Sequence, residues 1–287
     1  MKRKAFKPSL IIVYALLIFW ALVIIFPVYW VIISSFKLPI AVMQGATYIP
    51  FVDFDPSLRN YEHLFTVGLK ESKIGLHFLN SAIASIGGAV VAVSLGSLAA
   101  YGLSRFMYKI GPINNNVIMF LIMGLRMLPP VSLVFAFLLM FQATKLVDTL
   151  FGLILVYATF NLPLAVWILR DAFNEIPREL DESALIDGGS WFTSFWNIVL
   201  PLAFGSIAAT FLMCFIFNWN EYLFALVLTY IKSGTVPLLL AQSSTSRGMD
   251  WGRMSALTVI SILPSIAAGI FLEKYLRKGI LAGAIKG

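Results

Sequence analysis

Residues 179–201 read ELDESALIDGGSWFTSFWNIVLP and place four acidic side chains in a chain that is otherwise strongly apolar. Three of these acids favour the positive end of a helix, whereas Asp187 falls in the last turn, where an anion opposes the helix dipole. Gly188 and the glycine after it then supply a stop or a sharp bend. Ser190 can cap a second short helix, whose aromatic residues suit a membrane surface or a partner's groove. The stretch therefore predicts a docking element made of two short helices.

The composition around this stretch predicts an integral membrane protein. Of the 287 residues, 60% are hydrophobic and only 12% are charged, which is outside the range of soluble domains. Cys214 is the single cysteine, so an intramolecular disulfide or a thiolate metal cluster is excluded. Lysines and arginines outnumber acids by 21 to 14, but they flank apolar runs and form no patch with interleaved aromatic residues. We therefore expect no binding to nucleic acid.

Six apolar segments are long enough to cross a bilayer, which takes about 20 residues each. They lie near residues 9–34, 78–104, 116–140, 149–169, 202–230 and 254–276. We predict an all-α integral membrane protein that forms one transmembrane domain over residues 1–287. Basic residues are more frequent on the side of the termini, which predicts cytoplasmic termini. The docking element then lies in the cytoplasm, between spans 4 and 5, and the two long loops at 35–77 and 231–253 lie outside.

Span 2 carries small residues at every fourth position, namely Gly88, Ala92, Gly96 and Ala100. Such a row lets another helix backbone approach closely. The row is either a packing face within this chain or a contact with a second membrane subunit.

Arg126 and Glu221 are ionisable residues deep inside apolar spans, where an unpaired charge is costly. Their depths are compatible with an ion pair between helices, and the alternative is the polar wall of a solute pathway. Asn80, Asn218 and Asn220 could bind a polar solute or bond helix to helix.

Prolines are expected to interrupt helical hydrogen bonding within three spans, at Pro129 and Pro130, at Pro163 beside Asn161, and at Pro264.

Motifs for catalysis are missing from the sequence. It has no G-x-x-x-x-G-K-[ST] phosphate loop and no H-E-x-x-H motif, and its two histidines, His63 and His77, fall in an outer loop. We expect the chain not to be an enzyme. If it pumps, another chain uses the fuel.

The docking element resembles a motif of ABC importer permeases. Glu182, Ala184 and Gly188, followed by Ile198, Leu200 and Pro201, match the pattern E-A-A, three residues, G, nine residues, I-x-L-P, with Ser183 in place of the second motif residue. The stretches NSAIAS, AAYGLSRF, RMLPP, WNEYLFAL and YLRKGILAGAIKG extend the likeness along the chain. Together they resemble the maltose-type (MalG-like) branch of carbohydrate permeases.

This resemblance implies a binding-protein-dependent importer in the bacterial cytoplasmic (inner) membrane. Its partners would be a homologous second permease, two ABC ATPase subunits and an extracytoplasmic solute-binding protein, with ATP and Mg bound by the ATPases and no cofactor in this chain. The solute would be a sugar or sugar-like molecule. The docking element would be the coupling helix that seats on the ATPase, through Glu182, Ser183, Ala184, Asp187, Gly188, Ile198 and Pro201. The binding protein would meet the loop after span 5, around Ser246, Gly248 and Trp251.

Two other classes of function stay open. One is a secondary transporter driven by an ion gradient, with Arg126 and Glu221 in its relay. The other is a membrane scaffold that transports nothing.

Overall fold

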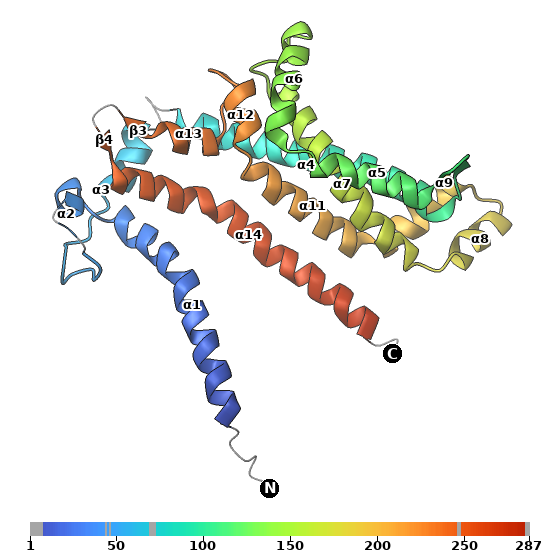
Figure 1. Cartoon of the computed structure of the whole chain (residues 1–287), viewed down its shortest axis with the longest axis horizontal. Helices are drawn as coiled ribbons and strands as arrows, with labels where there is room; N and C mark the ends of the chain where they lie inside the picture. The colour runs from blue at the N-terminus through green and yellow to red at the C-terminus, as the bar shows by residue number, and fades with distance from the viewer. Residues whose placement is uncertain (1–7, 44, 46, 69–72, 246–247, 285–287) are drawn as a thin grey trace. The chain divides into compact units, whose positions relative to one another are not determined.

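The computed structural model describes residues 8–43, 45, 47–68, 73–245 and 248–284, and nearly all of its regular structure is helical (Figure 1). The chain divides into two compact units. One comprises Met1–Ile74 with Leu240–Ile262, and the other comprises Gly75–Leu239 with Leu263–Gly287.

The first unit contains one long apolar helix and several short elements. Its elements are α1 (Pro8–Ser35), α2 (Pro39–Met43), α3 (Arg59–His63), the π-helix η1 (Leu64–Gly68), the hairpin of β3 (Ser244–Thr245) and β4 (Gly248–Met249), and the first part of α14 (Trp251–Ala284).

The chain after α1 is held by one buried lysine and one buried amide. The ammonium of Lys37 donates to the carbonyl of Thr47 and lies 4.3 Å from the centre of the Trp30 ring. The side-chain amide of Asn60 donates to the carbonyls of Ser35 and Lys37, both at 2.9 Å. These polar groups are satisfied locally, as burial requires.

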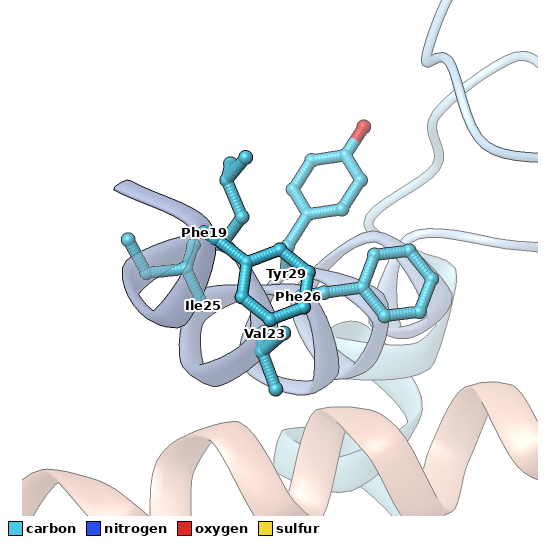
Figure 2. Close-up of a pocket in the computed structure, with 6 residues that line it drawn as sticks. Phe19, Val23, Ile25, Phe26 and Tyr29 are labelled. Carbon is cyan, nitrogen blue, oxygen red and sulfur yellow. The ribbon is translucent and has the colours of Figure 1, made fainter. Parts of the chain in front are cut away.

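An apolar recess of about 550 Å³ lies along α1 and is lined by Phe19, Leu22, Val23, Ile25, Phe26 and Tyr29 (Figure 2). Its one polar side chain is Tyr29, whose hydroxyl donates to the carbonyl of Tyr48 at 2.6 Å. The recess offers no free polar group to fix a solute, and it is therefore not a candidate site.

The second unit contains the remaining helices, and α4, α13 and α14 run from one unit into the other along the chain. Its elements are α4 (Ile74–Arg105), β1 (Lys109–Ile110) paired with β2 (Ile113–Asn114), α5 (Asn115–Met127), α6 (Pro130–Ala143), α7 (Leu150–Asn174), α8 (Glu179–Ile186), α9 (Trp191–Ser194), the π-helix η2 (Phe195–Val199), α10 (Leu200–Leu202), α11 (Phe204–Trp219), α12 (Leu223–Leu228) and α13 (Val236–Gln242).

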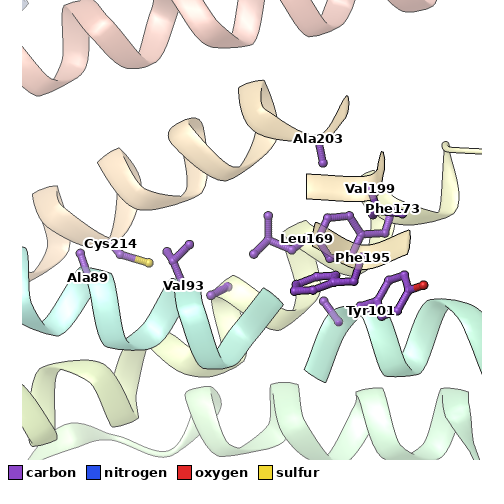
Figure 3. Close-up of a cluster of buried hydrophobic side chains, with 11 residues drawn as sticks. Ala89, Val93, Tyr101, Leu169, Phe173, Phe195, Val199, Ala203 and Cys214 are labelled. Carbon is purple, nitrogen blue, oxygen red and sulfur yellow. The ribbon is translucent and has the colours of Figure 1, made fainter. Parts of the chain in front are cut away.

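One apolar cluster in the core of this unit contains residues of α4, α7, η2 and α11 (Figure 3). Tyr101, Phe173 and Phe195 pack as a group of aromatic rings at one end of the cluster, with 4.9 Å between the ring centres of Tyr101 and Phe195. The cluster therefore reaches from the helices of the spans to the residues that follow α9.

The small-residue row on α4 packs within the chain. A Cβ built on Gly88 would lie 2.8 Å from the Cβ of Tyr157, and one built on Gly96 would lie 2.7 Å from the Cβ of Ala165. Both neighbours belong to α7. Of the two interpretations of this row, the structure shows the internal one at these two glycines.

Four helices are long and apolar enough to cross a membrane, namely α1, α4, α7 and α14. Two further candidates are bent pairs, α5 with α6 at 87° and Trp191–Leu202 with Phe204–Trp219 at 77° (Figure 1). Counting each pair as one span gives up to six spans among the described residues. The interruption expected at Pro129 and Pro130 is confirmed, because α5 ends at Met127 and α6 begins at Pro130. The expectation of one continuous helix over 202–230 is wrong, because α11 ends at Trp219 and α12 begins at Leu223.

The prolines explain where one of these breaks occurs. Leu128 and Pro129 each precede a proline, which disfavours helical ψ, and both are extended with ψ of 129° and 126°. Pro163 and Pro264 lie within the continuous helices α7 and α14, so each interrupts the hydrogen bonding there without ending the helix. A single proline removes one hydrogen bond, which packing can compensate, whereas two consecutive prolines restrict two residues in a row.

Candidate functional site

The docking element, residues 179–201, forms the two short helices that its sequence predicts. Between them Gly188 has φ of +84°, a conformation that side chains with a Cβ rarely adopt. The amide of Gly189 donates to the carbonyl of Ala184 at 2.9 Å, and the hydroxyl of Ser190 accepts from the amide of Thr193 at 3.2 Å to cap α9. The glycine bend and the serine cap are confirmed.

The described residues leave one surface of the docking element uncovered. Ile186 is 86% exposed and Phe192 is 65% exposed, and Trp196 is also exposed. Glu182 and Ser183 are exposed on α8 beside them. Exposed apolar side chains with acids nearby are typical of a surface that another protein covers.

Asp181 lies on the opposite, buried side and has a role that the sequence did not reveal. Its carboxylate pairs with Arg105 at 2.7 Å from Nε to Oδ2, and each of these side chains is 1% exposed. Tyr101 donates its hydroxyl to Oδ1 at 2.8 Å, and Ser194 donates its own at 2.5 Å. The sequence placed this acid only by its favourable position in the first turn of a helix.

The end of α4 is bonded to α7 as well as to α8. Arg105 donates Nη1 to the carbonyl of Phe173 at 2.9 Å and Nη2 to that of Ile176 at 3.1 Å. Arg178, just before α8, donates to the carbonyl of Ser104 at 2.8 Å. These polar groups tie the docking element to the ends of two long helices.

A separate cavity of about 240 Å³ lies within the second unit, lined by Arg126, Pro130, Tyr157, Phe160, Asn161, Phe217, Asn218, Glu221 and Phe224. Arg126 donates Nη1 to the carbonyl of Phe160 at 3.0 Å and to Oδ1 of Asn161 at 3.3 Å. Its guanidinium carbon lies 4.9 Å from the centre of the Phe217 ring. A cation–π contact of this kind stabilises a guanidinium away from bulk water.

Glu221 lines the same cavity, but its carboxylate accepts hydrogen bonds from backbone amides. It accepts from the amides of Phe224 at 2.9 Å and Ala225 at 3.2 Å, at the beginning of α12. A carboxylate there satisfies free amides and favours the positive end of the helix. Among the described residues no ion pair joins Arg126 to Glu221, so the pairing considered from their depths is not formed.

The asparagines divide between the cavity and other places. Asn218 lines the cavity, accepts from Asn161 at 2.6 Å and donates to the carbonyl of Ser85 at 3.1 Å. Asn80 instead donates to the carbonyls of Lys232 and Gly234. Asn220 donates to the carbonyl of Ile216 and, at 3.2 Å, to the hydroxyl of Ser265. The structure brings together Arg126, Asn218 and Glu221, and it places Asn80 and Asn220 outside the residues that line this cavity.

The loops at the other end of the second unit are joined by Asp148, which precedes α7. Its carboxylate accepts from the four successive amides of residues 230–233 at 3.1 to 3.2 Å and from the hydroxyl of Ser233 at 3.0 Å. Burial raises the pKa of this carboxyl, but the backbone hydrogen bonds outweigh burial and lower the pKa to about 2. The aspartate is therefore a charged clamp between two loops.

The residues expected to meet a binding protein are only partly described. Ser246 lies outside the described residues. Gly248 belongs to β4, opposite Thr245 of β3, and Trp251 begins α14 with its side chain about half exposed.

Known proteins with related sequences and folds are permeases. The family model for the "binding-protein-dependent transport system inner membrane component" matches residues 92–281. The trehalose/maltose transport system permease protein MalG of Thermococcus litoralis is 33% identical, with all of both chains covered. The inner membrane ABC transporter permease protein YcjP of Escherichia coli is 34% identical over 74% of each chain, and the trehalose transport system permease protein SugB of Mycobacterium tuberculosis is 31% identical over 97% of this chain and 95% of its own.

A solved structure has the same fold. It is described as a bacterial ABC transporter involved in the import of the acidic polysaccharide alginate, and one of its chains aligns with a TM-score of 0.76 and 24% identity over 95% of this chain and 99% of its own. Permeases of this kind are not themselves catalytic, because partner ATPase subunits bind the ATP. The chain thus belongs to the binding-protein-dependent inner membrane components, the multi-pass permease subunits of ABC importers.

Proposed function

We propose that this permease imports a sugar or sugar-like solute, such as an oligosaccharide, polyol or glycoside, and that the cavity at Arg126 is part of its route. The composition of the cavity is the observation that carries the proposal. Aromatic rings alternate there with amide and guanidinium groups, which is the combination that a molecule with apolar C–H faces and many hydroxyls requires.

The hydrogen bonds already made leave donors for a solute. Among the described residues, only Nη1 of the Arg126 guanidinium has a hydrogen-bond partner, so Nε and Nη2 remain available. The ring of Phe217 is about half exposed beside them. At about 240 Å³ the cavity is smaller than typical ligand pockets of about 300–1,000 Å³, which supports a site completed by the paired permease.

The relatives add support for the solute class. Two of them bear names that specify trehalose and maltose or trehalose, and a third, the NgcG protein of Streptomyces coelicolor, is described as a diacetylchitobiose uptake permease. We extend only the shared class, a small glycoside, to this chain.

The docking element is proposed to seat on an ATPase subunit. Its candidate contacts are Glu182, Ser183, Ala184, Asp187, Gly188, Ile198 and Pro201. The exposed apolar residues beside Glu182 support this assignment, because no part of the described chain covers them. The bend at Gly188 gives the element the angular shape that a cleft in a partner can hold.

The arrangement of the importer completes the proposal. It comprises this chain, a homologous second permease, two ATPases and an extracytoplasmic binding protein that meets the loop around Ser246, Gly248 and Trp251. Both termini and the docking element lie in the cytoplasm. The excess of basic residues on that side supports this orientation.

Proteoliposomes that contain the whole importer test the solute and the energy source together. With ATP inside and no ion gradient, we expect uptake of at least one labelled probe among trehalose, maltose and mannitol, dependent on the binding protein. Uptake that requires an ion gradient and no ATP would favour the secondary transporter instead. Failure of all three probes in an importer with an active ATPase would contradict the solute class.

The role of the cavity is tested by Arg126→Met, which keeps an apolar stem and removes the donors. We expect uptake to fall about tenfold or more, since hydrogen bonds to charged groups contribute about 1.5–3 kcal/mol each, while ATPase copurification is unchanged. Arg59→Met is the matched control, because Arg59 is exposed on α3. Equal uptake by the two variants would remove Arg126 from the route.

A further inference from the structure

We propose that the buried ion pair of Arg105 with Asp181 is the positioning link that makes α8 move with α4 and α7 as one rigid body. This inference rests on the proposed seating of the docking element on an ATPase. It assigns the transmission of force to two residues outside the ATPase contact surface.

The carboxylate of Asp181 is held from two helices. Its Oδ2 takes Nε of Arg105 and its Oδ1 takes the hydroxyl of Tyr101, both from α4, whereas the hydroxyl of Ser194 reaches Oδ1 from α9. The short helices on both sides of the glycine bend are therefore fixed to the same carboxylate. With each oxygen engaged, α8 cannot rotate on α4 without breaking a buried charge-assisted bond.

The guanidinium of Arg105 extends the link to α7. It presents Nε to Asp181, Nη1 to the carbonyl of Phe173 and Nη2 to that of Ile176. A planar guanidinium has a fixed donor geometry, so these three bonds define the position of the α7 end relative to α4.

Stability alone is a weak explanation for this pair. Buried ion pairs gain little over well-packed apolar residues, and their best-attested contribution is to specify one arrangement. The pair of Arg170 with Asp171 provides the contrast, because its atoms are 3.9 Å apart and the Asp171 side chain is 58% exposed. Such a pair restrains little.

The link has a direct continuation to the cavity. Arg105 ends α4, and Ser85 on the same helix accepts a hydrogen bond from Asn218, which lines the cavity. At 1.5 Å per residue the two points are about 30 Å apart along one continuous helix. If α4 moves together with α8, the movement therefore also displaces the wall of the cavity.

The test uses the assembled importer with Asp181→Asn, and Asp171→Asn as the matched control. In Asp181→Asn we expect the ATPase to copurify within about twofold of the parent and to hydrolyse ATP, while the solute imported per ATP falls about tenfold, the size of a typical coupling between sites. Asp171→Asn should keep the parent ratio. If Asp181→Asn lowers only the amount of assembled importer and keeps the parent ratio, the pair is merely structural and the proposal is overturned.

A distance measurement gives a second readout that does not depend on the solute. Spin labels are placed at Glu179→Cys on α8 and Leu98→Cys on α4, both exposed, in a Cys214→Ala background. In the parent we expect one narrow distance distribution that is the same with and without ATP, and in Asp181→Asn a broad distribution that shifts with ATP. A parent distribution that itself shifts with ATP would overturn the link.

Milder variants keep the proposal testable if Asp181→Asn does not assemble. Tyr101→Phe removes one hydroxyl and leaves the ion pair, so the imported solute per ATP should fall by a smaller factor. Arg105→Lys keeps the charge but cannot reach Asp181 and the carbonyls of both Phe173 and Ile176, and it should behave like Asp181→Asn. If both variants import as much solute per ATP as the parent does, the link is contradicted.

The outcomes also separate this inference from the proposed function. A parent importer that binds ATPase but imports none of the sugar probes contradicts only the solute class, and the distance measurement still decides the link. A parent chain that binds no ATPase removes the docking proposal and the link together.

Discussion

Replacing Gly188 with alanine should impair seating on the ATPase through the backbone alone. The glycine has φ of +84°, and a Cβ added to it would have no heavy atom within 4 Å. Steric overlap with neighbours is therefore absent, and the cost is that of a left-handed conformation, about 1–2 kcal/mol for a residue with a Cβ. This energy lowers the population of the bent element about 5- to 30-fold.

The assay is copurification of the ATPase with the permease, followed by ATP hydrolysis stimulated by loaded binding protein. When the ATPase is limiting, Gly188→Ala should lower the amount of copurified ATPase and the stimulated ATP hydrolysis about 5- to 30-fold. Gly188→Asn should lower them less, because asparagine adopts this conformation more readily than alanine.

Gly111 provides the control at equal backbone cost. It has φ of +58°, a Cβ there would also have nothing within 4 Å, and it lies in the turn between β1 and β2. Gly111→Ala should leave ATPase copurification unchanged. If Gly188→Ala and Gly111→Ala bind the ATPase equally well, the reasoning that the bend is required for seating is refuted.

Three further predictions concern packing, charge and topology. Gly96→Val should lower the stability of the purified permease by about 1–3 kcal/mol in thermal unfolding, because the added Cβ would lie 2.7 Å from the Cβ of Ala165, whereas Gly124→Val, with open space around it, should not show this steric loss. Asp148 has a folded pKa of about 2 against an ordinary 3.8, so its contribution to the stability of the fold is present above about pH 4 and is lost as the pH falls towards 2. Asp148→Asn should therefore flatten the dependence of Tm on pH between about pH 4 and 2. An unchanged dependence would contradict the clamp. A cysteine at Ser244 should react with an impermeant maleimide from outside the cell, and labelling only from the cytoplasm would reverse the proposed orientation.

Local rules predicted the shape of the docking element because its shape is local. The positive φ of Gly188 and the cap at Ser190 depend on neighbours within a few residues. The anchoring of Asp181 was missed because its partner Arg105 is 76 residues earlier in the chain. Nothing in the sequence around Arg105, in the stretch AAYGLSRF, or around Asp181, in the docking element, indicates that these two side chains meet.

The cavity was predictable in its polar part only. Arg126, Asn218 and Glu221 are conspicuous because polar groups are costly inside apolar spans. Phe160, Phe217 and Phe224 are not conspicuous, since the chain has 24 phenylalanines and most occur in apolar surroundings. The same limit applies to the prolines, because packing around Pro163 decides whether the helix continues, and packing is not visible in the sequence.

The separation between Arg105 and Asp181 also orders events during synthesis. At about 5–20 residues per second, the 76 residues between them take roughly 4 to 15 s to translate. During that interval the guanidinium at the end of α4 lacks its carboxylate, and at first also the carbonyls of Phe173 and Ile176, which are translated later than α4. A chain that terminates before α8 therefore keeps an unpaired cation where the complete chain buries it. The pair that joins the docking element to α4 is therefore complete only after α8 has been synthesised.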